Sequence, residues 1–325
     1  MDIITHIAPD IVQLRLPLPF RLDHIHSYLI RDHDQWVIVD CGLNTSLTRR
    51  VWRGVFNELE IRPEQIGRII VTHAHPDHLG LAGWLQNLTG ATVLMSADEQ
   101  AQMIAVWRER QSMMAQMNAW YIQHGLNSKW ANDVVEETER TALRTEPLPT
   151  DEIVVPYEST IAIGDRRFRT IRGPGHSNGQ LMLYDVDDKL LLCGDHVLMK
   201  ITPHIGYWPS VDVNPLQQFL NSLKALQHLD VRLALPGHRA LITDWAGRSE
   251  ELQAHHAERL DVTGNCVPIE GATARQIAQA VFRLRDLNVH ETRFAMAETL
   301  SHLELLVDRG LISAEREELT HYFPA

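Results

Sequence analysis

The chain has 325 residues, of which 44% are hydrophobic, which is ordinary for a globular protein and leaves room for one large domain and a smaller one. Its net charge of −12 disfavours nonspecific binding to nucleic acid and to anionic membranes. Three widely separated cysteines, Cys41, Cys193 and Cys266, do not make a disulfide framework.

The N-terminal residues show no targeting signal. No basic region precedes a continuous apolar core there, so we expect no secretion signal. No uncharged apolar run reaches the ~18 residues that a membrane span needs. A cytoplasmic protein without a membrane anchor is the expectation.

Short strands and helices alternate along most of the chain. In the first half we expect strands at residues 11–16, 24–31, 35–40, 68–71 and 92–95, with helices at 46–59 and after Pro76. In the second half we expect a helix at 215–229 and strands near Ile153, Ile161, Phe168, Leu181 and Leu190 and at 231–235. Such a mixture predicts sheets and helices packed in layers.

The run Thr72-His73-Ala74-His75-Pro76-Asp77-His78 is the most informative stretch. It follows an apolar, β-prone segment, and side chains two apart on an extended chain point the same way, so His73 and His75 can grip one ion. Pro76 suits the first turn of a helix and turns Asp77 and His78 elsewhere, towards a second ion. Imidazole and carboxylate are ligands that zinc accepts, and no nearby cysteine indicates a closed structural site. A histidine-rich surface turn is the alternative, but chance rarely places such a run directly after a strand.

Three further candidates lie downstream, each in a turn with glycine that follows an expected strand. His176 lies in Gly-Pro-Gly-His-Ser-Asn-Gly, Asp195 in Cys-Gly-Asp-His, and His238 in Pro-Gly-His. Glycine lets the backbone approach a ligand closely, and functional groups concentrate at strand ends on a rigid scaffold.

The ordered series HAHPDH, GPGHSNG, CGDH and PGH resembles the metallo-β-lactamase superfamily, in particular its glyoxalase II-like hydrolase branch. The resemblance covers roughly residues 10–245 and implies an α+β fold, a four-layer αβ/βα metallo-β-lactamase sandwich over residues 1–247. It implies that His73, His75 and His176 bind a first metal ion, that Asp77, His78 and His238 bind a second, and that Asp195 bridges the two. Asp40 resembles the family's buried aspartate that supports the ligand loops; a simple turn aspartate is the alternative.

The resemblance also implies a mechanism. Two divalent ions, zinc in the first place with iron or manganese as alternatives, would share a bridging hydroxide that attacks a carbonyl carbon. Asp77 would shuttle a proton to the leaving group. His204 and Tyr207, in the loop after Asp195, are weaker candidates for contacting the substrate as donors to the oxyanion. His24, His26 and His196 are expected to be structural.

Residues 97–145 form an expected helical insertion rich in methionine and tryptophan. Flexible thioethers and aromatic rings suit an adaptable apolar surface, so this segment is a candidate lid over an acyl substrate, with Trp107 and Trp120 as substrate contacts. A role in an ordinary core or in a homodimer contact is an equally weighted alternative.

Residues 248–325 form an expected small, mostly helical C-terminal domain. One helix starts at a Thr273 cap, a second ends near Gly310, and a small hairpin follows; this resembles the winged-helix appendage of some superfamily members. The segment has eight arginines, no lysine and thirteen acidic residues, which opposes a phosphate-binding face. We therefore expect a packing or dimerisation module, and nucleic acid is an unlikely partner on this balance.

These observations favour hydrolysis of a small-molecule thioester or carboxylic ester, of the hydroxyacylglutathione or acyl-CoA kind. A phosphodiesterase or ribonuclease is one alternative, because the same metal core supports that chemistry. A lactonase or β-lactamase is a second alternative. A non-enzymatic ligand-binding regulator is disfavoured by the complete set of seven ligands.

Overall fold

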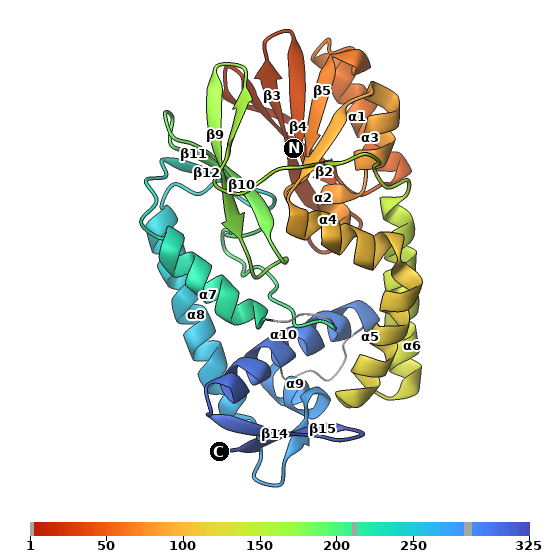
Figure 1. Cartoon of the computed structure of the whole chain (residues 1–325), viewed down its shortest axis with the longest axis vertical. Coiled ribbons are helices and arrows are strands. Elements are labelled where there is room, and N and C mark those ends of the chain that lie inside the picture. The colour runs from red at the N-terminus through yellow and green to blue at the C-terminus, as the bar shows by residue number, and fades with distance from the viewer. Residues whose placement is uncertain (1–2, 210–212, 283–287) are drawn as a thin grey trace.

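The computed structural model describes residues 3–209, 213–282 and 288–325. Two sheets lie face to face at one end of the molecule, with helices outside them, and the C-terminal elements form the other end (Figure 1). This arrangement confirms the expected αβ/βα sandwich. Within the described ranges, no helix has the length and apolar character to cross a membrane.

The first sheet has seven strands in the order β1-β2-β3-β4-β5-β6-β7. Their bounds are β1 Ile4–Ala8, β2 Ile11–Pro17, β3 His24–Asp32, β4 Gln35–Val39, β5 Ile66–Ile70, β6 Thr92–Met95 and β7 Ile153–Val154. Strands β4 to β7 run parallel, so the segments that follow them leave the sheet at one edge. Asp40 and the histidine-rich run therefore start side by side.

The second sheet has five strands in the order β12-β11-β10-β9-β8. Their bounds are β8 Thr160–Ile163, β9 Arg166–Gly173, β10 Gln180–Asp185, β11 Leu190–Gly194 and β12 Leu233–Pro236. Because β11 and β12 are parallel while β9, β10 and β11 are antiparallel, the β9–β10 turn and the ends of β11 and β12 share one edge. His176, Asp195 and His238 all lie at that edge.

Alternate residues of the strands separate the core into layers. Ile30, Val37, Phe168, Leu181 and Leu183 are buried between the two sheets. The opposite faces pack on helices: α1 Ser46–Glu58 and α3 Ala82–Thr89 cover the first sheet, and α7 Pro215–Leu226 and α8 Trp245–Asn265 cover the second. The short helix α2, Pro76–Leu79, follows the histidine run as the proline predicts.

The insertion is helical, as its composition predicts. It comprises α4 Ala97–Met103, a π-helical turn Ile104–Arg108, α5 Arg110–Gln123, α6 Ser128–Ala142 and the 3-10 turn Leu143–Thr145. Helices α5 and α6 run along one side of the molecule from the sheets to the C-terminal elements (Figure 1).

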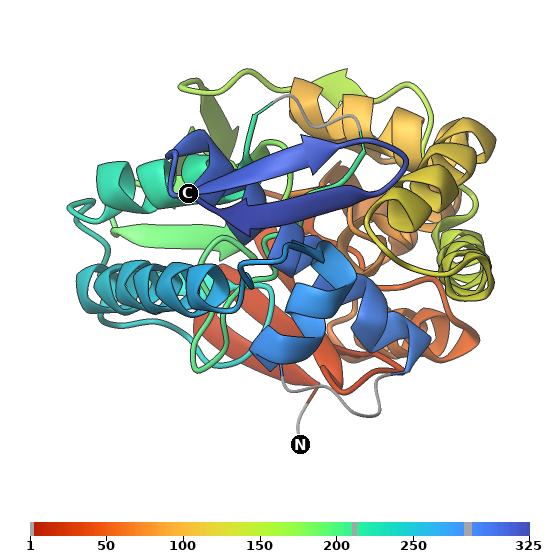
Figure 2. The ribbon, with the colours of Figure 1, turned by 90° about the horizontal axis from the view of Figure 1, so that it is seen from below.

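The C-terminal part consists of α9 Ala274–Phe282, α10 Val289–Asp308 and a three-stranded sheet of β13 Ala272–Thr273, β14 Ile312–Arg316 and β15 Thr320–Pro324. The predicted hairpin, β14–β15, lies across the end of the molecule (Figure 2). Helix α10 contacts α6, α7, α8 and α9. Its residues 299–306 are all buried.

Some features go beyond the sequence-based prediction. Strand β1 was not expected, and α8 runs through the expected domain boundary after residue 247. Asp244 caps this helix by accepting a hydrogen bond from the Gly247 amide, at 2.9 Å. The chain therefore passes position 247 inside a helical turn and not in a linker.

Candidate metal centre

All seven predicted ligands converge at the shared edge of the two sheets. Their side chains make three groups, each with ligand atoms within 4.8 Å of one another: His73, His75 and His176; His73, His78 and Asp195; and Asp77, His78 and His238. Four separate segments supply these groups, namely the stretch after β5, the β9–β10 turn, and the stretches after β11 and β12.

The first group contains three imidazoles that face one another. His73 Nε2 and His75 Nδ1 are 3.1 Å apart. The His176 ring lies edge-on to both, with centroids 5.0 Å from that of His73 and 4.5 Å from that of His75. Both His73 and His75 project to the same side, as their spacing on an extended segment predicts.

Asp195 lies between the groups. Its Oδ2 atom is 3.3 Å from His238 Nε2, 3.4 Å from His78 Nε2 and 3.6 Å from His176 Nε2. His238 Nε2 is also 3.2 Å from Asp77 Oδ2. One carboxylate oxygen therefore faces histidines of both halves of the cluster.

Asp40 supports two of the ligands from behind. Its Oδ2 accepts a hydrogen bond from His78 Nδ1, at 2.7 Å, and another from the Thr72 hydroxyl, at 2.8 Å. The Thr72 oxygen in turn lies 3.0 Å from His73 Nδ1. Because the hydroxyl proton goes to Asp40, Thr72 accepts from His73, and the Nε2 atoms of His73 and His78 keep their lone pairs for a metal ion.

Two more ligands are oriented by backbone carbonyls. His176 Nδ1 donates to the carbonyl of His204, at 2.8 Å, and His238 Nδ1 donates to the carbonyl of His24, at 2.8 Å. Each bond keeps a proton on Nδ1 and directs Nε2 at the cluster. Histidine residues His24 and His204 thus act here through their main chain.

The cluster is strongly polarised. Burial acts to lower the pKa of His238, but the carboxylates of Asp195 and Asp77 raise it to about 10. Burial acts to raise the pKa of Asp77, but the neighbouring imidazoles His78 and His238 hold it at about 2. Burial also acts to raise the pKa of Asp195, but His238 and His78 lower it well below its usual value, so both carboxylates are ionised at neutral pH, as metal binding requires.

The chemistry of the donors fits divalent metal ions. His78 Nε2, His176 Nε2 and Asp195 Oδ1 are buried and have no hydrogen-bond partner within the described ranges. A buried polar atom without a partner is costly, and these three point into the ligand groups. Nitrogen and oxygen donors of this kind suit zinc, iron or manganese.

Glu99, which the sequence-based prediction missed, ties two ligand loops together. From α4, its buried carboxylate accepts hydrogen bonds from the Ala74 amide at 2.8 Å, the Ser177 hydroxyl at 2.6 Å and the Gly179 amide at 2.9 Å. Ala74 lies between the ligands His73 and His75, and Ser177 follows His176. No local motif marks this glutamate, because its partners are distant in the sequence.

Trp107, which was expected to contact the substrate, packs against the ligand loop. The indole is buried, and Nε1 donates to the Ala74 carbonyl at 2.6 Å. The first turns of the insertion therefore hold Ala74 by both its amide and its carbonyl, through Glu99 and Trp107. These turns therefore support the loop that carries His73 and His75.

The other candidates are more peripheral. The His204 ring is directed at α10, with Nε2 3.1 Å from the Phe294 carbonyl, and the Tyr207 amide donates to the Ala297 carbonyl at 3.0 Å. Trp120 is partly buried on α5 and its ring lies 6.4 Å from that of Trp208. The buried His196 ring bonds to the Ser222 hydroxyl, at 3.0 Å, as expected of a structural residue.

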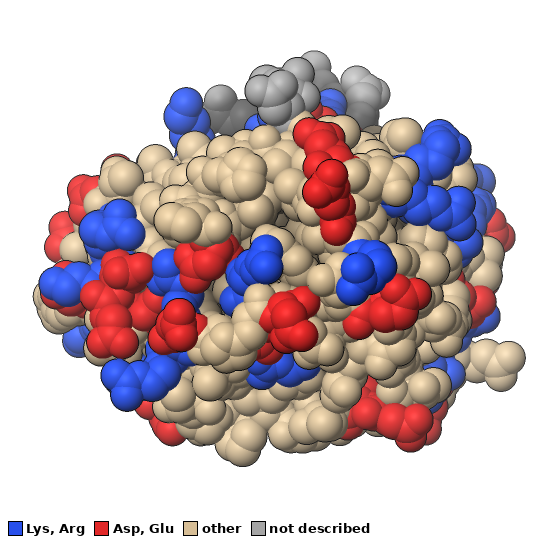
Figure 3. Space-filling model, turned by 90° about the horizontal axis from the view of Figure 1, so that it is seen from above, with Lys and Arg blue, Asp and Glu red and all other residues tan. Residues whose placement is uncertain are grey.

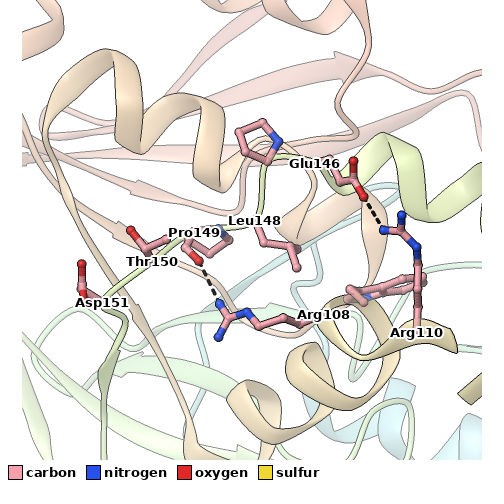
Figure 4. A pocket seen from close by; sticks show the side chains of 9 residues that line it. Arg108, Arg110, Glu146, Leu148, Pro149, Thr150 and Asp151 are labelled. Atoms are coloured by element: carbon pink, nitrogen blue, oxygen red, sulfur yellow. Dashed lines mark hydrogen bonds and ion pairs between the residues drawn. The ribbon is translucent and has the colours of Figure 1, made fainter. Parts of the chain in front are cut away.

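An open pocket lined by Trp107 and by residues 108, 110 and 146–151 lies beside the insertion (Figure 4). Two cations line it, but each is already paired: Arg108 lies 2.8 Å from the Glu152 carboxylate, and Arg110 pairs with Glu146. Arg108 also donates to the Pro149 carbonyl, at 3.0 Å. This pocket carries no ligand group of the metal centre.

Comparisons with known proteins cover both parts of the chain. The sequence profile of the metallo-beta-lactamase superfamily matches residues 21–238, and that of a metallo-beta-lactamase-like C-terminal domain matches residues 262–323. Among curated proteins, the probable metallo-hydrolase YqjP of Bacillus subtilis is 24% identical over 324 residues, which is 97% of each chain.

Two solved structures are similar over nearly the whole chain. A metallo-beta-lactamase family protein from Thermus thermophilus has a TM-score of 0.89 and 30% identity, covering 98% of this chain and 100% of its own. A beta-lactamase domain protein from Burkholderia ambifaria has a TM-score of 0.87 and 29% identity, covering 99% of this chain and 94% of its own. The similarity includes the C-terminal elements as well as the sandwich.

Proposed function

The chain belongs to the metallo-β-lactamase superfamily, and on this premise we propose that it is a dinuclear metal-dependent hydrolase that cleaves a thioester or a carboxylic ester. The position of Asp195 carries the proposal. Its Oδ2 atom lies 3.3–3.6 Å from Nε2 of His238, His78 and His176, so one carboxylate oxygen faces histidines of both predicted metal sites, which supports a carboxylate that two ions would share. Within the superfamily we favour the glyoxalase II-like branch, on the motifs around these residues.

Two metal ions would be held by different halves of the cluster. His73, His75 and His176 would hold the first, and Asp77, His78 and His238 the second. Ions bound there would supply Lewis acidity, which polarises a carbonyl group and lowers the pKa of water. Zinc is our first choice of metal.

Other residues of the chain orient the metal ligands and transfer a proton. Asp40 and Thr72 hold His73 and His78 in the tautomers that leave Nε2 free. The side chain of Asp77 is 22% exposed against 8% for Asp195, so Asp77 is the carboxylate better placed to pass a proton to a leaving group. No serine or cysteine nucleophile is needed.

The surroundings of the cluster favour an apolar acyl group. An aromatic belt, whose neighbouring ring centroids are 4.5–6.4 Å apart, runs from the β2–β3 loop over α10 to α5 and consists of Phe20, His290, Phe294, His204, Trp208 and Trp120. All six rings are only partly buried. His204 in this belt also gives its carbonyl to the ligand His176, which connects the belt to the metal centre.

A phosphodiesterase is less favoured. A polyphosphate backbone needs several charge-assisted contacts, whereas the chain has a net charge of −12. On the face opposite the C-terminal elements, acidic and basic side chains are interspersed (Figure 3). The two arginines beside Trp107 are paired with carboxylates.

The C-terminal elements, in our proposal, complete the hydrolase and do not bind nucleic acid. Their order of helix, strand, helix, helix and hairpin supports the winged-helix likeness. Helix α10 holds the loop after Asp195, because Ser301 Oγ donates to the Ile205 carbonyl at 2.7 Å and the Ala297 carbonyl accepts from the Tyr207 amide. That loop carries the carbonyl that orients His176.

A hydrolysis screen tests the proposal. The zinc-loaded protein is assayed against thioesters, carboxylic esters, lactones, β-lactams and bis-(p-nitrophenyl) phosphate, with Asp195→Asn as the matched variant. We expect thioesters or esters to be cleaved fastest and the variant to be inactive. Phosphodiester cleavage that exceeds every ester and thioester would overturn the substrate class.

A further inference from the structure

Arg293 is a cation of α10 that sits among the rings of the aromatic belt. Its guanidinium carbon lies 4.7 Å from the centre of the Phe294 ring and 5.8 Å from that of Trp208. Such contacts stabilise a cation without neutralising it. The side chain is largely buried, so its charge is partly removed from water.

Among the described residues, no carboxylate is in direct contact with this charge, and Glu137 acts on it only from beyond 4.0 Å. Among residues 3–209, 213–282 and 288–325, no acidic group lies within 4.0 Å of Arg293, although most arginines on α6, α8 and the strands have such a partner. Its Nη1 donates to the Thr138 hydroxyl, at 3.2 Å, and its buried Nε has no hydrogen-bond partner within those ranges. A buried arginine with unused donors is costly unless an anion arrives.

A second unsatisfied polar group lies in the same region. The Tyr121 hydroxyl on α5 is fully buried and also lacks a hydrogen-bond partner within the described ranges. Burial raises the pKa of Tyr121, and the charge of Arg293 opposes that rise, so the two side chains are electrostatic neighbours. Tyr121 is thus a second buried donor without a partner that is affected by the charge of Arg293.

Two hydrogen bonds connect the α10 backbone beside Arg293 to the metal centre. The carbonyl of Phe294, the next residue, is 3.1 Å from His204 Nε2, and the His204 carbonyl accepts from the ligand His176 at 2.8 Å. Arg293 is therefore joined to the ligand His176 through Phe294 and His204, and it lies beside the belt along which the apolar part of a substrate would run.

We infer that Arg293 binds a carboxylate of the substrate, remote from the bond that is cleaved. The planar guanidinium offers a pair of parallel donors that a carboxylate matches, whereas a diphosphate would need several cations. The inference rests on the proposed function and narrows it: the substrate is a thioester or ester that carries a carboxylate. Arg293 is a binding residue, and the bond-breaking chemistry remains with the metal ligands.

Binding of uncleaved amide analogues tests this without relying on turnover. The probes are N-butyryl-β-alanine and N-butylsuccinamate, which carry the carboxylate on opposite sides of the amide, and the corresponding carboxamides. Zinc-loaded protein is titrated by calorimetry and by tryptophan fluorescence, since Trp208 lies beside the guanidinium. We expect at least one carboxylate to bind ten or more times more tightly than its carboxamide.

Three variants identify the source of that preference. Arg293→Gln should abolish it, while Arg309→Gln, which removes an exposed charge at the far end of α10, should preserve it. Arg293→Lys keeps the charge but not the paired donors, so the ratio of carboxylate to carboxamide affinity should fall at least threefold. If the glutamine variant does not fold, the lysine variant tests the inference. Unfolding temperature and zinc content are measured alongside.

Two results would overturn the inference: no preference for either carboxylate in the wild-type protein, or a preference that survives replacement of Arg293, as it would if the carboxylate bound only to the metal ions. Failure of the proposed function gives a different result, because the wild-type protein would then bind the carboxylates with preference but hydrolyse no thioester or ester.

Discussion

Glu99 lies on α4, a helix that contributes no metal ligand. Its replacement by glutamine should nevertheless destabilise the metal centre. One carboxylate oxygen accepts hydrogen bonds from Ser177 and Gly179, and the other accepts from the Ala74 amide. A glutamine amide offers only one acceptor oxygen, so its NH2 group must face at least one of these donors. Leaving one buried donor unpaired costs about 1–3 kcal/mol.

The metal affinity should fall together with the stability. Ala74 lies between His73 and His75, and residues that orient metal ligands typically change metal affinity about 10–100-fold when they are replaced. The two quantities are measured separately, by urea unfolding of the metal-free protein and by competition with a zinc chelator. We expect losses in both measurements for Glu99→Gln and larger ones for Glu99→Ala, which removes every acceptor.

A matched control is available on α6. Glu139 is exposed on that helix, so Glu139→Gln makes the same chemical change and should alter stability by no more than about 0.5 kcal/mol. The reasoning would be refuted if Glu99→Gln matched the Glu139 variant in both unfolding and zinc affinity.

Three further predictions follow from particular contacts. Asp40→Asn should keep the fold but weaken zinc binding about 10–100-fold, because His78 loses its carboxylate partner; unchanged competition with a chelator would contradict this. Trp120→Ala should raise KM with little change in kcat, as steady-state kinetics would show. Trp107→Phe removes the hydrogen bond to Ala74 and should instead weaken zinc binding in competition with a chelator. The same effect from both variants would contradict this distinction. Burial raises the pKa of Glu298 from 4.5 to about 7, so the folded protein holds a proton that the unfolded chain releases, and this group makes stability fall as pH rises from about 4.5 to 7. Glu298→Gln should flatten that part of the stability curve in urea unfolding at several pH values, and an identical slope would count against it.

The ligands could be predicted from the sequence because each lies in a local pattern. His73 and His75 follow an apolar strand directly, and His176, Asp195 and His238 each sit in a glycine-containing turn after one. That the seven side chains at the ends of two different sheets form one cluster was implied by the resemblance to the superfamily, and the structure brings them together.

The supporting residues could not be predicted in that way. Glu99 lies within a helix, and what distinguishes it is contact with Ala74 and Gly179, which only the fold brings near. Trp107 was interpreted by composition as part of an apolar lid, but its indole N–H serves the ligand loop. Arg293 comes from the C-terminal helix, whose overall acidity gave no indication of a cation beside the aromatic belt.

The number of zinc ions bound per chain tests the central claim most directly. Metal-free protein is titrated with zinc by calorimetry, and the bound metal is counted after removal of the excess. Two ions per chain for the wild-type protein, with one site lost in His75→Ala and the other in His238→Ala, is the predicted result. Saturation at one ion or fewer, or two ions that survive both substitutions, would contradict a dinuclear centre built from these residues.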